Sequence, residues 1–369
     1  MDVISPDALA DRIDRGERTT LLDTRNRSEI DEWRIDAPEI DRVEVPYMQF
    51  VAAGAKGDPA DLLPDDITEP VVAVCARGEA SDEVAAMLRE AGVEAVNLAG
   101  GMHGWARVYR ATDLDVDGDG ATVVQYRRPS SGCLSYLVVA GDEALVVDPL
   151  RAFADRYAND AADRGADIVA AVDTHVHADH VSGLRDVDAT RYMSTRAVER
   201  GVTYHVETLV DGDELAIGGT TVAVVASPGH TTGGVSLHVG DVLLCGDTLF
   251  VDGVARPDLE PAAGGATADD GDGTEDASVE AAAREHARDL YRTLTERFAR
   301  FDDDVVVAPG HYGDGAERAA DGSYTARLGS LRDRLWAFDA DREAFVDRVV
   351  DGVGARPAND ERIVAVNLG

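Results

Sequence analysis

Lysine is nearly absent from this sequence of 369 residues, in which Lys56 is the only one. The 35 lysine and arginine residues together face 71 aspartate and glutamate residues, so the formal net charge is −36. A chain this negative repels phosphate backbones, and we expect no nucleic-acid partner. The acidity runs through the whole chain, which argues against one acidic patch for a basic partner. It is typical of halophilic proteins that work in concentrated salt, where the Debye length falls to about 3 Å at 1 M.

Cysteine and long apolar runs are also scarce. The three cysteines, Cys75, Cys133 and Cys245, cannot build a disulfide framework and are typical of a reducing cytoplasm. The sequence contains no run of 18 apolar residues and begins without a signal-peptide pattern. We therefore expect a cytoplasmic protein without a membrane partner. Cys133 and Cys245 have apolar neighbours, and we expect both to pack in a core.

Metal-ligand side chains, in contrast, are concentrated in one short segment. His175, His177, Asp179 and His180 directly follow the apolar run 168–172. Neutral imidazole and carboxylate bind Zn, Fe or Mn, and side chains two apart on an extended segment project to the same side. The segment therefore predicts a metal site.

Three further candidate ligands, His230, Asp247 and His311, each stand in a glycine-containing turn. Each turn follows an apolar, strand-like run, at residues 222–227, 242–245 and 305–308. Loops held by rigid strands often carry catalytic groups, and glycine lets the backbone turn sharply enough to aim the next side chain. We expect these strand ends to converge on one metal-binding edge.

The order of these motifs, His-x-His-x-Asp-His, Pro-Gly-His-Thr, Gly-Asp-Thr and Pro-Gly-His, resembles the metallo-β-lactamase superfamily. The resemblance covers about residues 122–369. It implies an αβ/βα sandwich of two mixed sheets, with helices outside and the metal at one edge.

Two chemistries are open within that superfamily. The first is thioester hydrolysis at two zinc ions, as in the glyoxalase II-like enzymes that this region also resembles. A zinc-bound water, with its pKa lowered to about 7, would be the nucleophile. One ion would be held by His175, His177, His230 and Asp247, and the other by Asp179, His180, His311 and a bridging Asp247.

The second chemistry is oxidation at a single Fe(II) bound by His175, His230 and Asp247. A face of two histidines and one carboxylate is typical of non-haem iron oxygenases. Segments 131–136, 177–183 and 246–258 resemble the persulfide dioxygenase branch. The resemblance implies that a small-thiol persulfide and O₂ are converted to thiol and sulfite. We favour this iron enzyme and keep the two-zinc hydrolase as the alternative.

Other polar residues near these motifs are candidate contacts. In the iron branch His177, Asp179, His180 and His311 would lie near the metal without binding it. Arg256 is expected to pair with Asp258 or to contact a substrate carboxylate. Tyr312 is a candidate contact for the thiol carrier, and Asp173 for orienting a histidine ligand.

A separate α/β unit is expected at residues 1–107, with Cys75 as a candidate nucleophile. Cys75 follows the buried-strand pattern 71–74 and precedes a predicted helix at 82–90. A thiol in a loop at a helix N-terminus has its thiolate favoured by unpaired N–H groups and by the helix dipole. We therefore expect Cys75 to be reactive.

Residues 21–25 and 100–105 resemble a rhodanese domain, and the resemblance implies that Cys75 carries a persulfide. Arg77 and Gly78 would belong to its catalytic loop. The family often has arginine at the positions of Ala76 and Ala80. Without those charges the loop suits the thiosulfate dianion poorly.

The expected organisation is therefore α/β throughout, with the rhodanese-like domain (1–107) followed by the metallo-β-lactamase sandwich (122–369). An acidic linker is expected at 108–121, and a flexible acidic insertion at about 261–278. A homo-oligomer is compatible with the sequence.

If the acidic surface is an adaptation to salt, lowering the salt concentration should unfold the protein, because repulsion among the excess carboxylates is then unscreened. The melting temperature, followed by circular dichroism over a KCl series, should fall as KCl is lowered. A melting temperature independent of KCl would contradict the halophilic interpretation.

Overall fold

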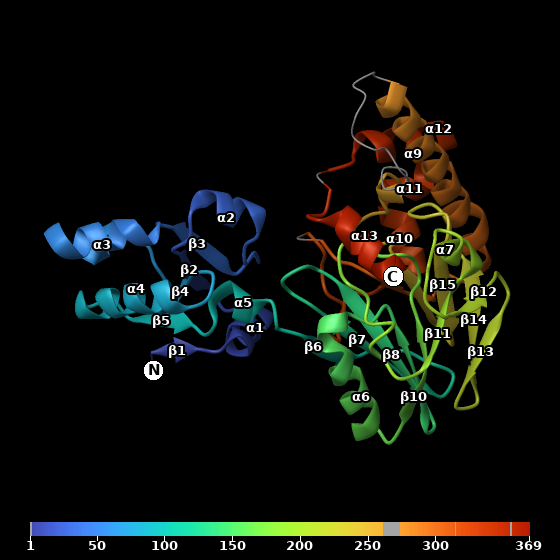
Figure 1. Ribbon diagram of the computed structural model, residues 1–369, viewed down its shortest axis with the longest axis horizontal. Coiled ribbons are helices and arrows are strands. Elements are labelled where there is room, and N and C mark those ends of the chain that lie inside the picture. The colour runs from blue at the N-terminus through green and yellow to red at the C-terminus, as the bar shows by residue number, and fades with distance from the viewer. Residues whose placement is uncertain (1, 261–273, 314, 355) are drawn as a thin grey trace. The chain divides into compact units, whose positions relative to one another are not determined.

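The computed structural model describes residues 2–260, 274–313, 315–354 and 356–369, without the side chains of 274–277. The chain divides into two compact units (Figure 1). The first comprises residues 1–110 and 128–132, and the second comprises residues 111–127 and 133–369.

The first unit is built on a sheet of five parallel strands in the order β1-β5-β4-β2-β3. The strands are β1 (Val3–Ile4), β2 (Thr19–Asp23), β3 (Ile40–Glu44), β4 (Val71–Val74) and β5 (Ala95–Leu98). The predicted strand at 71–74 is confirmed, and all four residues are buried. Val72 and Val74 pack on one face of the sheet, and Val71 and Ala73 on the other, as the period of two requires.

Helices cover both faces of this sheet. They are α1 (Pro6–Asp14), α2 (Arg27–Glu32), α3 (Tyr47–Lys56), the 3₁₀ turn Pro59–Leu62, α4 (Glu79–Glu90) and α5 (Gly101–Trp105). Helix α4 begins three residues earlier than the predicted helix at 82–90, because the left-handed Gly78 (φ 99°) ends the loop directly before Glu79.

The second unit contains two mixed sheets. The first sheet is ordered β12-β11-β10-β9-β8-β7-β6. Its strands are β6 (Arg110–Asp113), β7 (Ala121–Arg127), β8 (Leu134–Ala140), β9 (Glu143–Val147), β10 (Asp167–Val172), β11 (Thr190–Ser194) and β12 (Glu207–Leu209). From β9 to β12 the strands are parallel, whereas β7, β8 and β9 pair antiparallel.

The second sheet follows the strand order along the chain, from β13 to β18. Its strands are β13 (Glu214–Ile217), β14 (Thr220–Ala226), β15 (Val235–Val239), β16 (Val242–Gly246), β17 (Val306–Pro309) and β18 (Ala326–Arg327). Only β16 and β17 pair in parallel among these.

Helices flank the sheets of the second unit. They are α6 (Ala154–Asp163), α7 (Thr195–Val198), α9 (Thr274–Arg292), α10 (Leu328–Arg334), α11 (Trp336–Asp339), α12 (Arg342–Asp351) and α13 (Asp360–Leu368), with short turns at Arg151–Phe153, Thr293–Arg297 and Phe298–Arg300.

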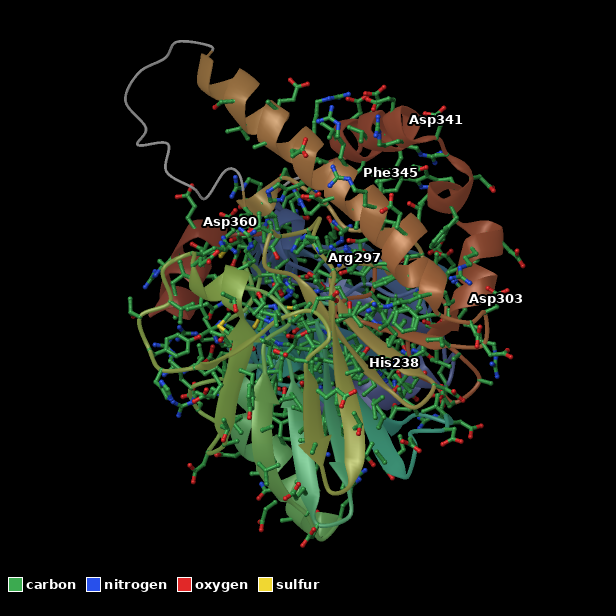
Figure 2. The ribbon with its side chains drawn as sticks, turned by 90° about the vertical axis from the view of Figure 1, so that its right-hand side faces the viewer. His238, Arg297, Asp303, Asp341, Phe345 and Asp360 are labelled. Carbon is green, nitrogen blue, oxygen red and sulfur yellow. The ribbon has the colours of Figure 1, made fainter. Side chains whose placement is uncertain are left out.

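Apolar side chains of both sheets, such as Val138 and Leu244, form one shared core. Leu243 points the opposite way and packs with Leu290 of α9 and Phe345 of α12, because successive strand residues face opposite sides. Figure 2 shows α9 lying across this outer face, with Phe345 beside it. The expected sandwich of two mixed sheets with helices outside is therefore present.

The prediction of a linker at 108–121 is wrong. Residues 110–113 form β6 and residues 121–127 form β7, so the acidic stretch between them is the turn that joins two paired strands. Asp and Gly favour turns as well as linkers, and the local sequence does not separate the two. Of the insertion expected at 261–278, residues 261–273 lie outside the described residues, and 274–278 belong to α9.

Among the residues that the structure describes, no helix combines the length and the apolarity needed to cross a membrane.

Candidate metal centre and thiol site

Strand ends bring the candidate ligands of the second unit together. His175 follows β10, Asp247 follows β16 and His311 follows β17. Glycine is required at two of these turns, because a Cβ on Gly246 (φ 49°) would lie 2.3 Å from Thr174 Oγ1. A Cβ on Gly310 would lie 2.5 Å from Asp247 Oδ1. The glycines therefore let the strand ends approach closely enough for one site to form.

His175, His230 and Asp247 form a compact, nearly buried triad. Asp247 Oδ2 lies 3.8 Å from His175 Nε2 and 3.9 Å from His230 Nε2. The ligand atoms of the three residues all lie within 4.8 Å of one another. This is the arrangement of two histidines and one carboxylate that a divalent ion can bind on one face.

The protonation of the two histidines fits a metal at this triad. His230 Nδ1 lies 2.8 Å from the carbonyl oxygen of Arg256, to which it donates. His175 Nδ1 lies 3.0 Å from Thr174 Oγ1. The proton of each ring is thus held on Nδ1, and the lone pair on Nε2 is free. Among the described residues His175 Nε2 has no hydrogen-bond partner although it is buried, as expected of an atom whose partner is an ion.

Asp148, which the sequence did not single out, supports this arrangement. It is buried and adopts a left-handed backbone conformation (φ 50°). Its Oδ1 accepts a 2.7 Å hydrogen bond from the Thr174 amide and lies 3.2 Å from His177 Nε2. Its Oδ2 accepts from Thr174 Oγ1 at 2.9 Å, so that the hydroxyl oxygen can accept from His175. Asp148 directly follows β9. Its position at the end of an apolar strand is the one feature of the sequence that could have indicated a role at the site.

Asp173, proposed above to orient a histidine, lies farther from the rings. Its Oδ1 is 3.8 Å from His177 Nε2 and has no hydrogen-bond partner among the described residues. Burial raises the pKa of Asp173 to about 6. The main acceptor for His177 is therefore Asp148, and His177 Nε2 faces away from the triad.

His311 connects the triad to a second group. Its Nδ1 donates to Asp247 Oδ1 at 2.8 Å, and its Nε2 lies 3.0 Å from Asp179 Oδ2. Burial lowers the pKa of His311, but the carboxylates of Asp247 and Asp179 outweigh burial and raise it well above its usual value. His311 thus lies as a cation between two carboxylates, and both of its nitrogens are engaged.

Cys133 is buried, as expected of a core residue, and it also contacts the polar group around Asp179. Its Sγ lies 3.2 Å from Asp179 Oδ2. Burial and Asp179 raise the pKa of the Cys133 thiol, whereas His311 and hydrogen bonds with His180 and His311 lower it to about 7 overall. Cys245 differs, because its Sγ donates to the Leu249 carbonyl at 3.2 Å in an apolar cluster and burial raises its pKa to about 12.

Asn367 of α13 holds the loop that carries the histidines. Its Nδ2 donates to the carbonyl oxygens of His177 and His180 at 3.0 and 2.9 Å. Its Oδ1 accepts from the Ser182 amide at 2.9 Å. These contacts span more than 180 residues of sequence, and no local pattern in the sequence indicated them.

Both candidate substrate contacts, Arg256 and Tyr312, interact with other side chains of the protein. Arg256 forms a bidentate ion pair with Asp258 through its Nε and Nη2 atoms, each at 2.8 Å. The ring of Tyr312 stacks on Tyr324 with centroids 3.6 Å apart and packs against the core. A substrate role for either side chain stays a prediction.

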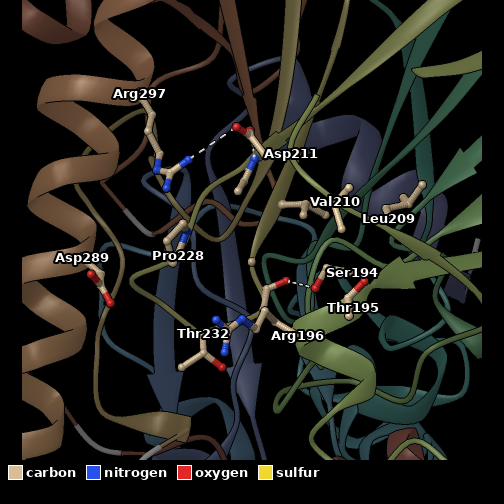
Figure 3. Close-up of a pocket in the computed structure, with 14 residues that line it drawn as sticks. Ser194, Thr195, Arg196, Leu209, Val210, Asp211, Pro228, Thr232, Asp289 and Arg297 are labelled. Carbon is tan, nitrogen blue, oxygen red and sulfur yellow. Dashed lines mark hydrogen bonds and ion pairs between the residues drawn. The ribbon is translucent and has the colours of Figure 1, made fainter. Parts of the chain in front are cut away.

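A pocket of about 490 Å³ lies next to the loop that carries His230 (Figure 3). Val210, Pro228 and Thr232 line it, and at its rim Arg297 and Asp211 form an ion pair of 3.8 Å. No residue of the triad lines this pocket. It therefore identifies no substrate site by itself.

In the first unit, Cys75 lies at the end of β4 in the loop before α4. Its Sγ accepts hydrogen bonds from the Gly78 amide at 3.1 Å and from Ser81 Oγ at 3.2 Å. Burial raises the pKa of Cys75, but the hydrogen bonds from Ser81 and from the loop amides of Arg77 and Gly78 outweigh burial and lower it. The thiolate is therefore favoured, as the sequence predicted.

The Gly100-Gly101 pair fixes this loop. The amides of Met102 and His103 donate to the carbonyl oxygens of Cys75 and Ala76 at 2.9 and 3.0 Å. A Cβ on Gly101 (φ 56°) would lie 2.2 Å from the Cys75 carbonyl oxygen, so only glycine allows this approach. A pocket of about 320 Å³ opens at Cys75, and its lining includes Arg25, Glu29, Met48, Arg77 and Glu79.

Comparison with known families assigns both units. Residues 5–108 match the rhodanese-like domain, and residues 129–311 match the metallo-beta-lactamase superfamily. The chain joins a rhodanese-like domain to a metallo-β-lactamase domain. Both resemblances noted in the sequence are thus confirmed.

Two named relatives each match a part of this chain. The mitochondrial persulfide dioxygenase ETHE1 of Bos taurus is 34% identical over 155 residues, which are 39% of this chain and 59% of the relative. A hydroxyacylglutathione hydrolase of Yersinia pestis is 39% identical over 88 residues, 22% of this chain and 34% of the relative. The chain therefore spans less than two thirds of either relative.

Two solved structures share the fold of the metallo-β-lactamase domain. A metallo-beta-lactamase from Staphylococcus aureus has a TM-score of 0.56 at 25% identity, over 67% of this chain and 73% of that one. ETHE1 from Myxococcus xanthus has a TM-score of 0.53 at 25% identity, over 66% of this chain and 96% of that one.

The Asn367→Asp variant should bind a divalent metal ion, tested with Fe(II), about 10–100-fold more weakly, because an oxygen would replace the N–H donors that face the His177 and His180 carbonyl oxygens. Asn359→Asp, at the exposed start of the same helix, is the matched control. Competition with a ferrous chelator measures both affinities. Equal affinities for Asn367→Asp and the wild type would contradict a role of Asn367 in holding the loop.

Proposed function

We propose that the metallo-β-lactamase domain is an iron-dependent persulfide dioxygenase and that the rhodanese-like domain carries sulfane sulfur on Cys75. In the overall reaction, a small-thiol persulfide RSSH, O₂ and water give the thiol RSH, sulfite and two protons. The observation that carries the proposal is the triad of His175, His230 and Asp247, whose ligand atoms lie within 4.8 Å of one another.

The triad matches the ligand set of non-haem Fe(II) oxygenases. When bound there, Fe(II) would supply open positions for O₂ and for the persulfide sulfur. The chain's own residues orient the ligands, since Thr174 and the Arg256 carbonyl hold the two Nδ1 protons. His311 Nδ1 donates a hydrogen bond to Asp247 Oδ1, and the other oxygen, Oδ2, faces His175 and His230.

The similarity to the persulfide dioxygenase ETHE1 supports one iron over two zinc ions. The position of His311 fits either metal count. Its nitrogens lie 2.8 and 3.0 Å from Asp247 and Asp179, and the ligand atoms of these three residues lie within 4.8 Å of one another.

The Cys75 loop supports sulfur transfer. Its thiolate would attack the outer sulfur of RSSH, so that a new S–S bond forms on Cys75 and the old one breaks. The electron pair leaves with the carrier as RS⁻, and the amide of Gly78 and the hydroxyl of Ser81 stabilise the charge on Cys75 before attack. The cysteine persulfide would then either supply the dioxygenase through a thiol carrier or pass its sulfur to sulfite and form thiosulfate.

A two-zinc thioester hydrolase is the second candidate. His177 Nδ1 and His180 Nε2 are buried and have no hydrogen-bond partner in the part of the chain that the structure describes, and both atoms are suited to bind metal. The match to a hydroxyacylglutathione hydrolase favours the same alternative.

Metal content and O₂ uptake distinguish the two candidates. Anaerobically purified protein should contain about one iron per chain and consume O₂ when a small persulfide is added. The His230→Ala variant should lose both, because it removes one ligand of the triad. His205→Ala, an exposed histidine of the same domain, should retain both. About two zinc ions per chain, thioester hydrolysis and no O₂ uptake would instead establish the hydrolase.

Thiosulfate should be a poor sulfur donor to Cys75. Ala76 and Ala80 contribute no charge to the pocket, and Glu29 and Glu79 oppose its arginines. Thiosulfate:cyanide sulfurtransferase activity should therefore be low in the wild type and rise in Ala80→Arg, whereas sulfur transfer from a persulfide should be lost in Cys75→Ser. Rapid thiosulfate turnover by the wild type that Cys75→Ser abolishes would contradict this preference.

A further inference from the structure

The hydroxyl group of Ser81 in the rhodanese-like domain has more hydrogen-bond acceptors than it can serve. It has one proton, and three acceptor atoms lie near its Oγ, namely Asn97 Oδ1 at 2.7 Å, Cys75 Sγ at 3.2 Å and the Gly78 carbonyl oxygen at 3.4 Å. Ser81 is fully buried and Asn97 is 7% exposed. Donation to Cys75 therefore competes with donation to Asn97.

The orientation of the Asn97 amide follows from its second contact. Its Nδ2 lies 3.0 Å from the Gly78 carbonyl oxygen, which can only accept a hydrogen bond. The amide nitrogen must therefore face Gly78, and the amide oxygen must face Ser81. Because Asn97 Oδ1 has no proton to donate, the 2.7 Å contact places the Ser81 proton on the side of Asn97.

The sheet fixes the atoms on both sides of this hydroxyl. Asn97 lies on β5, where it pairs with Ala73 of β4, and its backbone amide donates to the Asp2 carbonyl oxygen at 2.9 Å. Cys75 begins the loop that follows β4, and Ser81 lies in the first turn of α4. Rotation of the Ser81 hydroxyl therefore decides which acceptor receives the proton.

The charge on Cys75 determines the preferred acceptor. A neutral sulfur, in a thiol or as the inner sulfur of a persulfide, is a weak acceptor, and the Asn97 oxygen is the better one. A thiolate is a charged acceptor, and its hydrogen bonds are about twice as strong as neutral ones. Ionisation of Cys75 should therefore turn the Ser81 hydroxyl away from Asn97 and leave a buried oxygen unpaired, which costs free energy.

We infer that Asn97 is a positioning residue of the sulfur-transfer site, which holds the Ser81 hydroxyl until Cys75 carries a negative charge. Asn97 thereby stabilises the neutral thiol and the loaded persulfide relative to the free thiolate. Its effect on the loaded state rests on the sulfur transfer proposed above, whereas its effect on ionisation does not.

The consequence for sulfur transfer follows from the acidity of Cys75. In loading, the thiolate attacks the outer sulfur of RSSH, the S–S bond of the donor breaks, and the electron pair leaves on RS⁻. The Ser81 hydroxyl then turns back to Asn97, because the Cys75 sulfur is neutral again. A less acidic thiol gives a stronger nucleophile and a poorer leaving group, so Asn97 favours the capture of sulfane sulfur over its release.

Other charges near Cys75 do not take part in this competition. The ionisable side chains that line the pocket at Cys75 come from the loops after β2 and β4, from α2, from α3 and from the start of α4; they are Arg25, Glu29, Tyr47, Arg77 and Glu79. Among the described residues, none of them is hydrogen-bonded to Ser81 or Asn97. They act on Cys75 with and without Asn97, so a comparison of variants isolates the Asn97 contact.

The rate at which iodoacetamide alkylates Cys75, measured over a pH series, tests the role of Asn97 in ionisation. Asn97→Ala should shift the inflection of this profile to lower pH, so that below the inflection alkylation is at least about twofold faster than in the wild type. Above the inflection it should be about twofold slower, because the more acidic thiolate is the weaker nucleophile. Peptide mass spectrometry distinguishes Cys75 from Cys133 and Cys245.

A double-mutant cycle separates this role from a structural one. Ser81→Ala should shift the inflection to higher pH, and Asn97→Ala should then cause no further shift in the Ser81→Ala background. If Asn97 only supported the loop through Gly78, its loss would weaken the contact of the Gly78 amide with Cys75 and shift the inflection to higher pH in both backgrounds. That result, or an unchanged inflection in Asn97→Ala, would overturn the inference.

Folding is checked by circular dichroism. If Asn97→Ala does not fold, Asn97→Val provides the same test, because valine suits a buried strand and also lacks the acceptor oxygen. The shift of the inflection to lower pH is expected for both variants.

A second readout depends on the proposed sulfur transfer. Cyanide attacks the outer sulfur of loaded Cys75 and gives thiocyanate, a proton and the Cys75 thiolate. This release should be about twofold faster in Asn97→Ala than in the wild type, because the more acidic Cys75 is the better leaving group. Equal release rates would overturn the effect on the loaded state. If wild-type Cys75 accepts no sulfur from a small persulfide, the proposed sulfur transfer fails, and the alkylation profile still decides the role of Asn97 in ionisation.

Discussion

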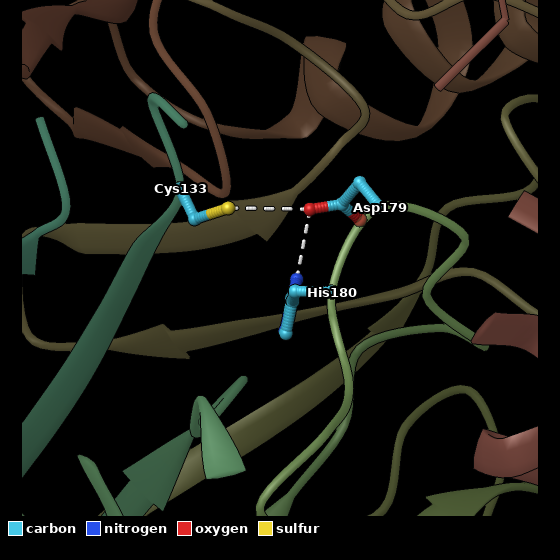
Figure 4. A group of neighbouring side chains, drawn as sticks. All are labelled: Cys133, Asp179 and His180. Atoms are coloured by element: carbon cyan, nitrogen blue, oxygen red, sulfur yellow. Dashed lines mark hydrogen bonds and ion pairs between the residues drawn. The ribbon is translucent and has the colours of Figure 1, made fainter. Parts of the chain in front are cut away.

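The metal centre depends on the two hydrogen bonds that His311 donates to carboxylates, at 2.8 Å to Asp247 and 3.0 Å to Asp179. The first turns the free oxygen of Asp247 toward His175 and His230. The second binds Asp179 Oδ2, which also contacts Cys133 and His180 (Figure 4). His311 thus contacts both of two groups of three candidate ligands, the triad and the group of Cys133, Asp179 and His180. Gly310 makes this possible, since a Cβ there would collide with Asp247.

The sequence predicted the parts of the site that local patterns encode. His175, His230 and Asp247 were identified because each follows an apolar strand, and the geometry of a sheet brings such ends to one edge. Cys75 was identified for the same reason. The supporting contacts were not predictable, because Asp148, Asn367 and Cys133 act through residues far away in the sequence. The turn at 113–120 was mistaken for a linker, because only the pairing of β6 with β7 distinguishes the two.

The two domains use hydrogen bonds to prepare different chemical groups, a thiolate in one and neutral imidazoles in the other. In the rhodanese-like domain, neutral donors, the Gly78 amide and the Ser81 hydroxyl, stabilise a thiolate at a helix N-terminus. In the metallo-β-lactamase domain, the Arg256 carbonyl and the Thr174 hydroxyl contact the Nδ1 atoms of His230 and His175, and the Nε2 atoms of the triad are left for a metal.

In the proposed reaction, one iron bound by the triad meets the persulfide. Mössbauer spectroscopy of protein loaded with ⁵⁷Fe under anaerobic conditions tests it most directly. We predict a single high-spin ferrous doublet from about one iron per chain, which changes when a small persulfide is added without O₂. A ferrous signal that does not respond to persulfide, or two coupled irons per chain, would contradict the account.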